Sequence, residues 1–200
     1  MPTPDAPPLD LDAPAIDLAR LVLGVTEEHL SLPTPCRYPV SVLLVHLIGL
    51  SRAFTDAARK LDGPLTRSAP SSADVELAAG WREELPLRLA GLVGGWRDPA
   101  AWTGMTVAGG VELPGTVMGV VANNELVLHG WDLAVATGQQ IRVAEANVAA
   151  SWQMVSETPD DPAARRGLFG PVVPVEDQAP LLHRTLGAAG RDPGWVAGAR

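Results

Sequence analysis

The chain has 200 residues, of which 46% are hydrophobic, so it is long and apolar enough to fold as a domain with a sizeable core. It carries 15 Lys and Arg against 23 Asp and Glu, a formal net charge of −8, without a basic cluster, which disfavours nucleic acid as a partner. The single cysteine, Cys36, excludes an internal disulfide and suits a reducing compartment.

Residues 1–12 are rich in Pro and Asp and are predicted to form a flexible tail. They lack the basic and apolar regions of a signal peptide, and no stretch approaches the ~20 apolar residues needed to cross a bilayer. The expectation is a cytoplasmic protein that does not enter a membrane.

Three helices are predicted in the first half of the chain. Asp12 and Pro14 mark the start of the first, which ends before Pro33. The second runs from about 39–41 to about 60, and the third from about 72, where Ser71 and Asp74 have capping-box spacing. Pro86 predicts a kink or a break in that third helix.

Residues 102–115 read as a short hairpin-like excursion around Gly109-Gly110, followed by helices over 116–137 and 144–157. A tail rich in Pro and Gly holds one further helical candidate, 179–189. The pattern predicts an all-α antiparallel bundle over residues 13–160, with an irregular C-terminal extension over 161–200 packed on it.

Chemistry-bearing residues lie on two of these helices. At 100° per residue, His46 falls within the apolar stripe of the second helix. Glu125, His129 and Asp132 stand at i, i+4 and i+7 on one face of the fourth, an almost wholly apolar helix. A buried carboxylate is costly unless it is paired, hydrogen-bonded or bound to a metal, so this cluster calls for an explanation.

Two imidazoles and one carboxylate are a common ligand set for Zn²⁺, and they also suit Fe²⁺ or Ni²⁺. His46, Glu125 and His129 are therefore candidate ligands of a divalent metal, with Asp132 orienting a ligand or meeting a cofactor or substrate at a cavity mouth. The alternative is a buried Glu–His hydrogen bond without a metal, because spacing alone does not establish that the two helices face each other.

Other candidates have a weaker case. His29 follows two glutamates near the end of the first helix, and His183 lies in the tail, so both read as surface residues. Cys36 could be a nucleophile, but a small buried thiol without a basic partner is the commoner role.

Several segments resemble an actinobacterial metal-binding family related to the N-terminal domain of mycothiol-dependent maleylpyruvate isomerase, within the DinB-like superfamily. The likeness runs through residues 33–36, 40–49, 125–134, 136–138 and 166–171. It implies a DinB-like four-helix bundle whose metal ligands match His46, Glu125 and His129. It also implies that a low-molecular-weight thiol, such as mycothiol or bacillithiol, is a co-substrate in related enzymes. The isomerase is expected to have a further C-terminal domain, for which 200 residues leave little room.

Two functions are consistent with these observations. The first is a metal-dependent thiol transferase or isomerase, in which the ion lowers the pKa of a bound thiol or water for attack on a small electrophile. The second is a non-catalytic protein that binds a small ligand over a metal, for sensing or stress response. Either would work as a monomer or homodimer, and a purely structural bundle without a metal is the third alternative.

Overall fold

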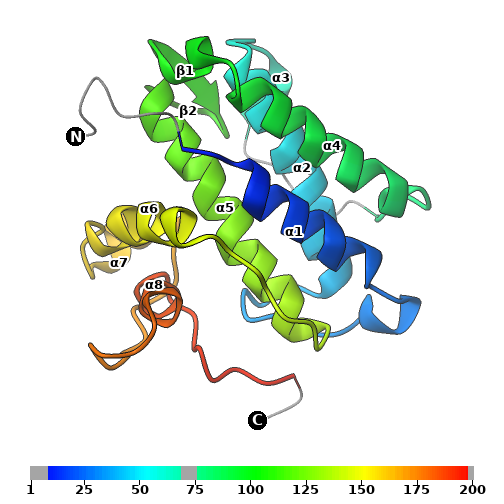
Figure 1. Cartoon of the computed structure of the whole chain (residues 1–200), viewed down its shortest axis with the longest axis vertical. Helices are drawn as coiled ribbons and strands as arrows, with labels where there is room; N and C mark the ends of the chain where they lie inside the picture. Colours follow the sequence, from blue (N-terminus) through cyan, green and yellow to red (C-terminus); the bar gives the residue numbers. More distant parts are fainter. Residues whose placement is uncertain (1–8, 69–75, 198–200) are drawn as a thin grey trace.

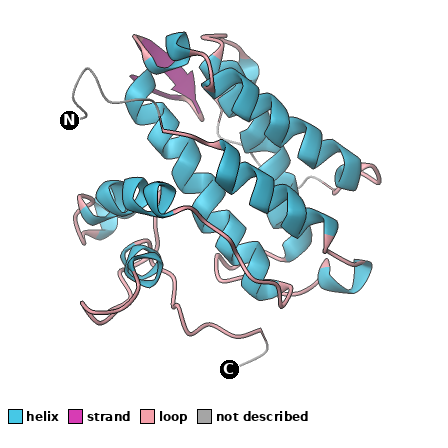
Figure 2. Cartoon of the chain, in the orientation of Figure 1, coloured by secondary structure: helices cyan, strands magenta, loops and turns pink. Residues whose placement is uncertain are grey.

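The computed structural model describes residues 9–68 and 76–197. Its regular structure is helical apart from one two-stranded sheet (Figure 2). The all-α class predicted from the sequence, with a hairpin-like excursion, is confirmed. Residues 1–8 of the predicted N-terminal tail lie outside the described residues, but Leu11 is buried in the core, so the bundle begins earlier than predicted.

Four helices form the bundle: α1 (Asp12–Leu23), α2 (Val40–Ala58), α4 (Trp81–Trp96) and α5 (Gly115–Ala136). Each packs against two others, in the cyclic order α1, α4, α2, α5 (Figure 1). A short helix, α3 (Pro64–Arg67), follows α2. The arrangement places α2 and α5 side by side, which is the pairing that brings the candidate metal ligands together.

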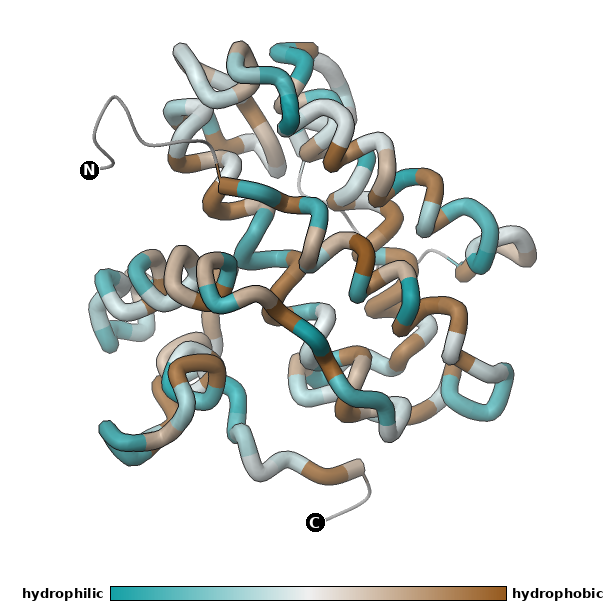
Figure 3. Tube along the Cα trace, viewed as in Figure 1, coloured by the Kyte–Doolittle hydropathy of each residue, from teal (hydrophilic) through white to brown (hydrophobic). Residues whose placement is uncertain are grey.

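The bundle core is made mostly of leucines at helical spacing. Hydrophobic and hydrophilic residues alternate along the helices (Figure 3), so apolar side chains on neighbouring helices can face the core. Burial of these side chains is the main driving force for folding. The fully buried residues of the core include Leu18, Leu21, Leu43, Leu47, Leu85, Leu89, Leu92, Leu126 and Leu133.

Helix α2 is long and apolar enough to match a membrane span by composition, which was not expected from the sequence. By length and mean hydropathy (1.4), Val40–Ala58 could span a membrane, although half of that window is buried inside the protein. A helix that packs against both α4 and α5 needs apolar residues on more than one side. Its composition is therefore that of a core helix.

Helix α4 differs from the prediction at both its start and its proline. The predicted capping box at Ser71 and Asp74 lies outside the described residues, and residues 76–80 are not helical. The helix begins at Trp81, after Gly80, with two glutamates in its first turn, where acidic side chains favour the helix dipole. It continues through Pro86, so of the predicted kink or break the break is excluded.

The predicted excursion is a β-hairpin of β1 (Met105–Ala108) and β2 (Val111–Pro114), with Val107 opposite Glu112. Gly109 and Gly110 have φ of 59° and 80°, values that turns joining two strands require and that glycine adopts without strain. The hairpin caps the end of the bundle where α5 starts (Figure 1).

The C-terminal part contains α6 (Glu145–Ser156), α7 (Pro162–Arg165) and α8 (Leu181–Ala188). Helix α6 packs on both α5 and α8. A second hydrophobic cluster joins Leu128 and Trp131 of α5 to Val155, Leu186 and Ala189. Trp131 thus packs toward α6 and α8.

Candidate metal centre

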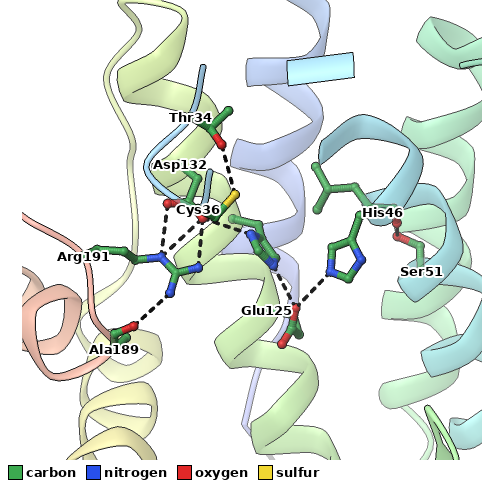
Figure 4. A network of polar contacts seen from close by, with 10 residues as sticks. Thr34, Cys36, His46, Ser51, Glu125, Asp132, Ala189 and Arg191 are labelled. Atoms are coloured by element: carbon green, nitrogen blue, oxygen red, sulfur yellow. Dashed lines mark hydrogen bonds and ion pairs between the residues drawn. The ribbon is translucent and has the colours of Figure 1, made fainter. Parts of the chain in front are cut away.

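The first candidate ligand, His46, stands on α2 and points toward α5 (Figure 4). Its Nε2 lies 3.6 Å from Oε2 of Glu125. Its ring meets the His129 ring edge-on, with centroids 4.9 Å apart and an interplanar angle of 80°. The side chain is 22% exposed, so His46 lies nearer the edge of the apolar stripe than the sequence suggested.

The other two ligands lie one turn apart on α5. His129 Nε2 is 3.1 Å from Oε2 of Glu125, as an i, i+4 pair on one helical face allows. His129 Nδ1 donates to Oδ2 of Asp132 at 3.0 Å, since an ionised carboxylate can only accept. One imidazole is thus held between two carboxylates.

These residues fit a divalent cation. One ligand atom from each of His46, Glu125 and His129 can be chosen so that all three lie within 4.8 Å of one another. Bonds of about 2.0–2.1 Å to zinc in a tetrahedron would place ligand atoms about 3.3 Å apart. The 3.1 and 3.6 Å contacts of the glutamate bracket that value. Small side-chain adjustments would close the set around one ion.

The electrostatics of the cluster are those of close opposite charges. Burial alone would raise the pKa of Glu125, but hydrogen bonds from His129 and His46 outweigh it and hold that pKa well below its ordinary value. Burial alone would lower the pKa of His129, but Asp132, Cys36 and Glu125 together raise it well above its ordinary value. In the metal-free protein, the positive charge of protonated His129 compensates part of the negative charge of Glu125 and Asp132.

Asp132 is fully buried, and its partners explain how a carboxylate can lie there. Arg191 binds it with two nitrogens, Nε to Oδ1 at 3.1 Å and Nη2 to Oδ2 at 2.9 Å (Figure 4). Its pKa is lowered, because the charge of Arg191 and the hydrogen bond from His129 outweigh the effect of burial. Of the two roles predicted for Asp132, its contacts and its burial favour orienting a ligand over meeting a cofactor or substrate at a cavity mouth.

The sequence analysis missed Arg191. It lies 59 positions after Asp132, beyond the last predicted helix, and no periodicity links the two. A buried aspartate on α5 needs a cation or donors, so its burial predicted that some partner exists without indicating which one.

The environment of Cys36 also differs from the prediction. The residue is half-buried and its Sγ lies 3.0 Å from Oγ1 of Thr34. It forms a second cluster with His129 and Asp132, whose ligand atoms lie within 4.8 Å of one another. The expectation that the thiol has no basic neighbour is therefore wrong, because the loop before α2 folds back onto α5.

The remaining two histidines do not join the centre. His29 accepts a hydrogen bond from the backbone N–H of Thr26 at 3.1 Å, in the 3₁₀ turn Glu27–His29 that follows α1. His183 is exposed on α8. Both were predicted to be surface residues of this kind.

The bundle of α1, α2, α4 and α5 has the DinB-like fold. The sequence model of the family described as mycothiol maleylpyruvate isomerase N-terminal domain matches residues 11–134. The chain belongs to this family, as the resemblance in the sequence predicted. No curated protein matches the chain.

Two solved structures have a similar fold. One is the crystal structure of mycothiol-dependent maleylpyruvate isomerase, with TM-score 0.66 and 16% identity over 94% of this chain and 90% of that chain. The other is a mutant of that enzyme, with TM-score 0.65 and 16% identity over 90% of this chain and 86% of that one. The likeness extends well past residue 134, so the expectation that 200 residues leave little room for the C-terminal part of the isomerase is wrong.

Proposed function

We propose that this protein binds one divalent metal ion through His46, Glu125 and His129 and uses it to activate a low-molecular-weight thiol. The observation that carries the proposal is the convergence of two imidazoles and a carboxylate from α2 and α5. Zn²⁺ is the first choice for this ligand set, with Ni²⁺ and Fe²⁺ as alternatives.

The three side chains leave room for a further ligand. His46 and Glu125 are 22% and 29% exposed, whereas His129 is only 11% exposed, so the open side of the cluster lies toward His46 and Glu125. A bound metal would supply Lewis acidity at that side and lower the pKa of a thiol or water there. The protein residues hold the ligand geometry and close the opposite side.

The charges nearby favour an anionic partner. With a divalent metal in place, the carboxylates of Glu125 and Asp132 and the guanidinium of Arg191 leave one net positive charge in the cluster. A thiolate would be attracted to such a site and could add to a small electrophile. The family relatives whose names include mycothiol support a thiol of this kind as the co-substrate.

The reaction that we propose is a thiol transfer or an isomerisation of a small electrophilic substrate, carried out in the cytoplasm by a monomer or homodimer. The non-catalytic alternative needs a ligand-sized cavity beside the metal. The surface depressions lined by residues 174–178 and by residues 9–12 with Val93, Trp96 and Arg97 contain none of the cluster residues. These depressions do not distinguish the two functions, since both need space for a small molecule beside the metal.

The test is turnover by zinc-loaded protein with mycothiol. With a chloronitrobenzene it is followed as thiol consumption and product mass. With maleylpyruvate it is followed by chromatographic separation of the isomers, because an isomerisation returns the thiol and leaves the mass unchanged. We expect catalysed turnover by the wild type and by the matched control His183→Ala, whose imidazole is exposed on α8. Glu125→Gln should lose it. A zinc-loaded wild type no faster than Glu125→Gln with either electrophile would overturn the catalytic proposal.

A further inference from the structure

The segment around α8 lies outside the family match at residues 11–134, yet it reaches the metal cluster. Arg191, which is only 9% exposed, supplies the salt bridge to Asp132. Its remaining terminal nitrogen, Nη1, donates to the carbonyl of Ala189 at 3.2 Å. Since Nε, Nη1 and Nη2 all have protein partners, the arginine is built into the structure and is not a free anion-binding group.

The contacts form a chain from Arg191 to the metal ligands. Arg191 holds both oxygens of Asp132, Asp132 accepts from Nδ1 of His129, and Nε2 of His129 faces Glu125. Carboxylates that bind the second nitrogen of a metal-ligating histidine fix its tautomer and ring orientation and increase its basicity. A buried carboxylate keeps its charge and direction only where a cation compensates it.

The backbone that delivers Arg191 is itself held in place. Its N–H donates to the carbonyl of Leu186 at 2.8 Å. Gly190 has φ of 82°, and a Cβ there would lie 2.6 Å from the Cα of Gly170. Arg165, which is 3% exposed, donates to the carbonyls of Gly170 and Ala188. It therefore links the loop after α7 to the end of α8. The position of the guanidinium therefore depends on the whole segment 165–191.

We propose that the C-terminal segment completes the metal centre, with Arg191 as a positioning residue that acts on His129 through Asp132. This inference rests on the proposed metal site. Arg191 contacts none of the proposed metal ligands. It orients the Asp132 carboxylate, which in turn orients the His129 imidazole. Because coupling between two sites is reciprocal, bound metal should in turn stabilise the docking of α8.

The first test is metal affinity, measured by competition between the protein and a chromophoric zinc chelator. Loss of an outer partner of a metal ligand costs about 10–100-fold in affinity, which is the effect expected for Asp132→Asn. Arg191→Gln, one contact further from the metal, should raise the zinc dissociation constant by up to that factor. Arg191→Lys should recover part of the loss. The matched control is Arg184→Gln, on the same segment, whose guanidinium stacks 4.5 Å over Trp152 and does not contact the cluster.

A double-variant comparison separates positioning from independent action. If Arg191 acts through Asp132, Arg191→Gln should weaken zinc binding little further in a protein that already carries Asp132→Asn. The pair of substitutions also removes both buried charges together, so the double variant can fold if Arg191→Gln alone does not. A further loss of about tenfold in the Asp132→Asn background would overturn the proposal.

The second readout is hydrogen exchange of the amides of α8 with and without zinc. Zinc should slow exchange in the wild type and in Arg184→Gln, and should have little effect on α8 in Arg191→Gln. If the wild type binds no zinc, the proposed metal site itself fails. If the wild type binds zinc but Arg191→Gln binds it equally well, the metal site stands and the positioning role fails.

Discussion

Helix α5 carries two buried polar networks on different sides, and they differ in kind. In the first, Asn123 donates to the carbonyl of Asn147 and to the hydroxyl of Ser151, and Asn147 donates to the Asn123 amide oxygen and to the carbonyl of Asp10. All of these groups are neutral, and donors meet acceptors one to one. This network joins α5 to α6 and to the residues before α1, and needs nothing from outside the protein.

The second network, around Glu125, His129 and Asp132, does not balance in the same way. Two imidazoles and a carboxylate converge on a common point, where a proton on a histidine nitrogen that faces Glu125, or a cation, compensates the carboxylate. A neutral, fully paired network is what packing alone requires. The metal site that we propose rests on this convergence.

The largest effect should come from Asp132→Ala, which leaves Arg191 buried without its counter-charge. Breaking a buried ion pair in this way typically costs about 3–5 kcal/mol, so the free energy of unfolding of the metal-free protein should fall by about that amount. Urea unfolding measures it. A loss below about 1 kcal/mol would mean that the charged network does not stabilise the C-terminal segment.

A smaller effect is expected in the neutral network. Asn147→Ala leaves the amide oxygen of Asn123 and the carbonyl of Asp10 without their donor, which costs about 1–3 kcal/mol in the free energy of unfolding. Zinc affinity should stay within about twofold of the wild type, because this network does not contact the cluster. Urea unfolding and chelator competition on the same sample test both parts, and a loss of zinc binding would show that the two sides of α5 are not independent.

The charged network should also make the stability of the metal-free protein depend on pH. The pKa of His129 is higher in the folded protein than its ordinary value of 6.5. Protonated His129 therefore stabilises the fold fully below pH 6.5, and this stability is lost as the pH rises through the higher folded value. The lowered pKa of Glu125 adds stability that is present above its ordinary value of 4.5 and is lost as pH falls. Urea unfolding with a chelator present should therefore give maximal stability between those two values.

The matched variant for that experiment is His129→Gln, which removes the titrating group. Its stability should fall less than that of the wild type between about pH 6 and about pH 9. A wild-type stability that rises over this range would contradict the electrostatic account of the cluster.

The smallest effect is expected for Cys36→Ser. The thiol shares a cluster with His129 and Asp132, but the ligand set that we propose does not include it. Zinc stoichiometry should stay at one per chain, as measured by elemental analysis. A loss of zinc would instead point to the Cys36, His129 and Asp132 cluster as the site.

Local patterns predicted much of this architecture. The helices predicted from about 39–41 to 60 and over 116–137 match α2 and α5. They carry His46 and the face formed by Glu125, His129 and Asp132, because helix geometry determines which residues share a face. The double glycine predicted the hairpin. The short helix α7 could also have been predicted, since Asp161 and Pro162 are a typical start and the Asp161 side chain caps Ala164 N–H at 2.9 Å.

Long-range contacts could not be predicted in this way. The pairing of Arg191 with Asp132 depends on how the extension folds back over α5, and the contact of Cys36 with His129 depends on the path of the loop before α2. Neither leaves a periodic trace in the sequence. Packing also explains why α4 does not break at Pro86, because Leu85, Leu89 and Leu92 are buried in the core and hold the helix together despite the missing backbone donor.

The measurement that tests the central claim most directly is metal content per chain, by elemental analysis of protein purified without a metal-binding tag. The wild type and His183→Ala should contain close to one zinc, nickel or iron per chain, and Glu125→Gln and His129→Ala should contain almost none while keeping their far-UV helicity. Stoichiometric metal that persists in both ligand variants would contradict the assignment of the site. A wild type that binds no metal even after incubation with zinc would leave Glu125 and His129 as a buried hydrogen-bonded pair.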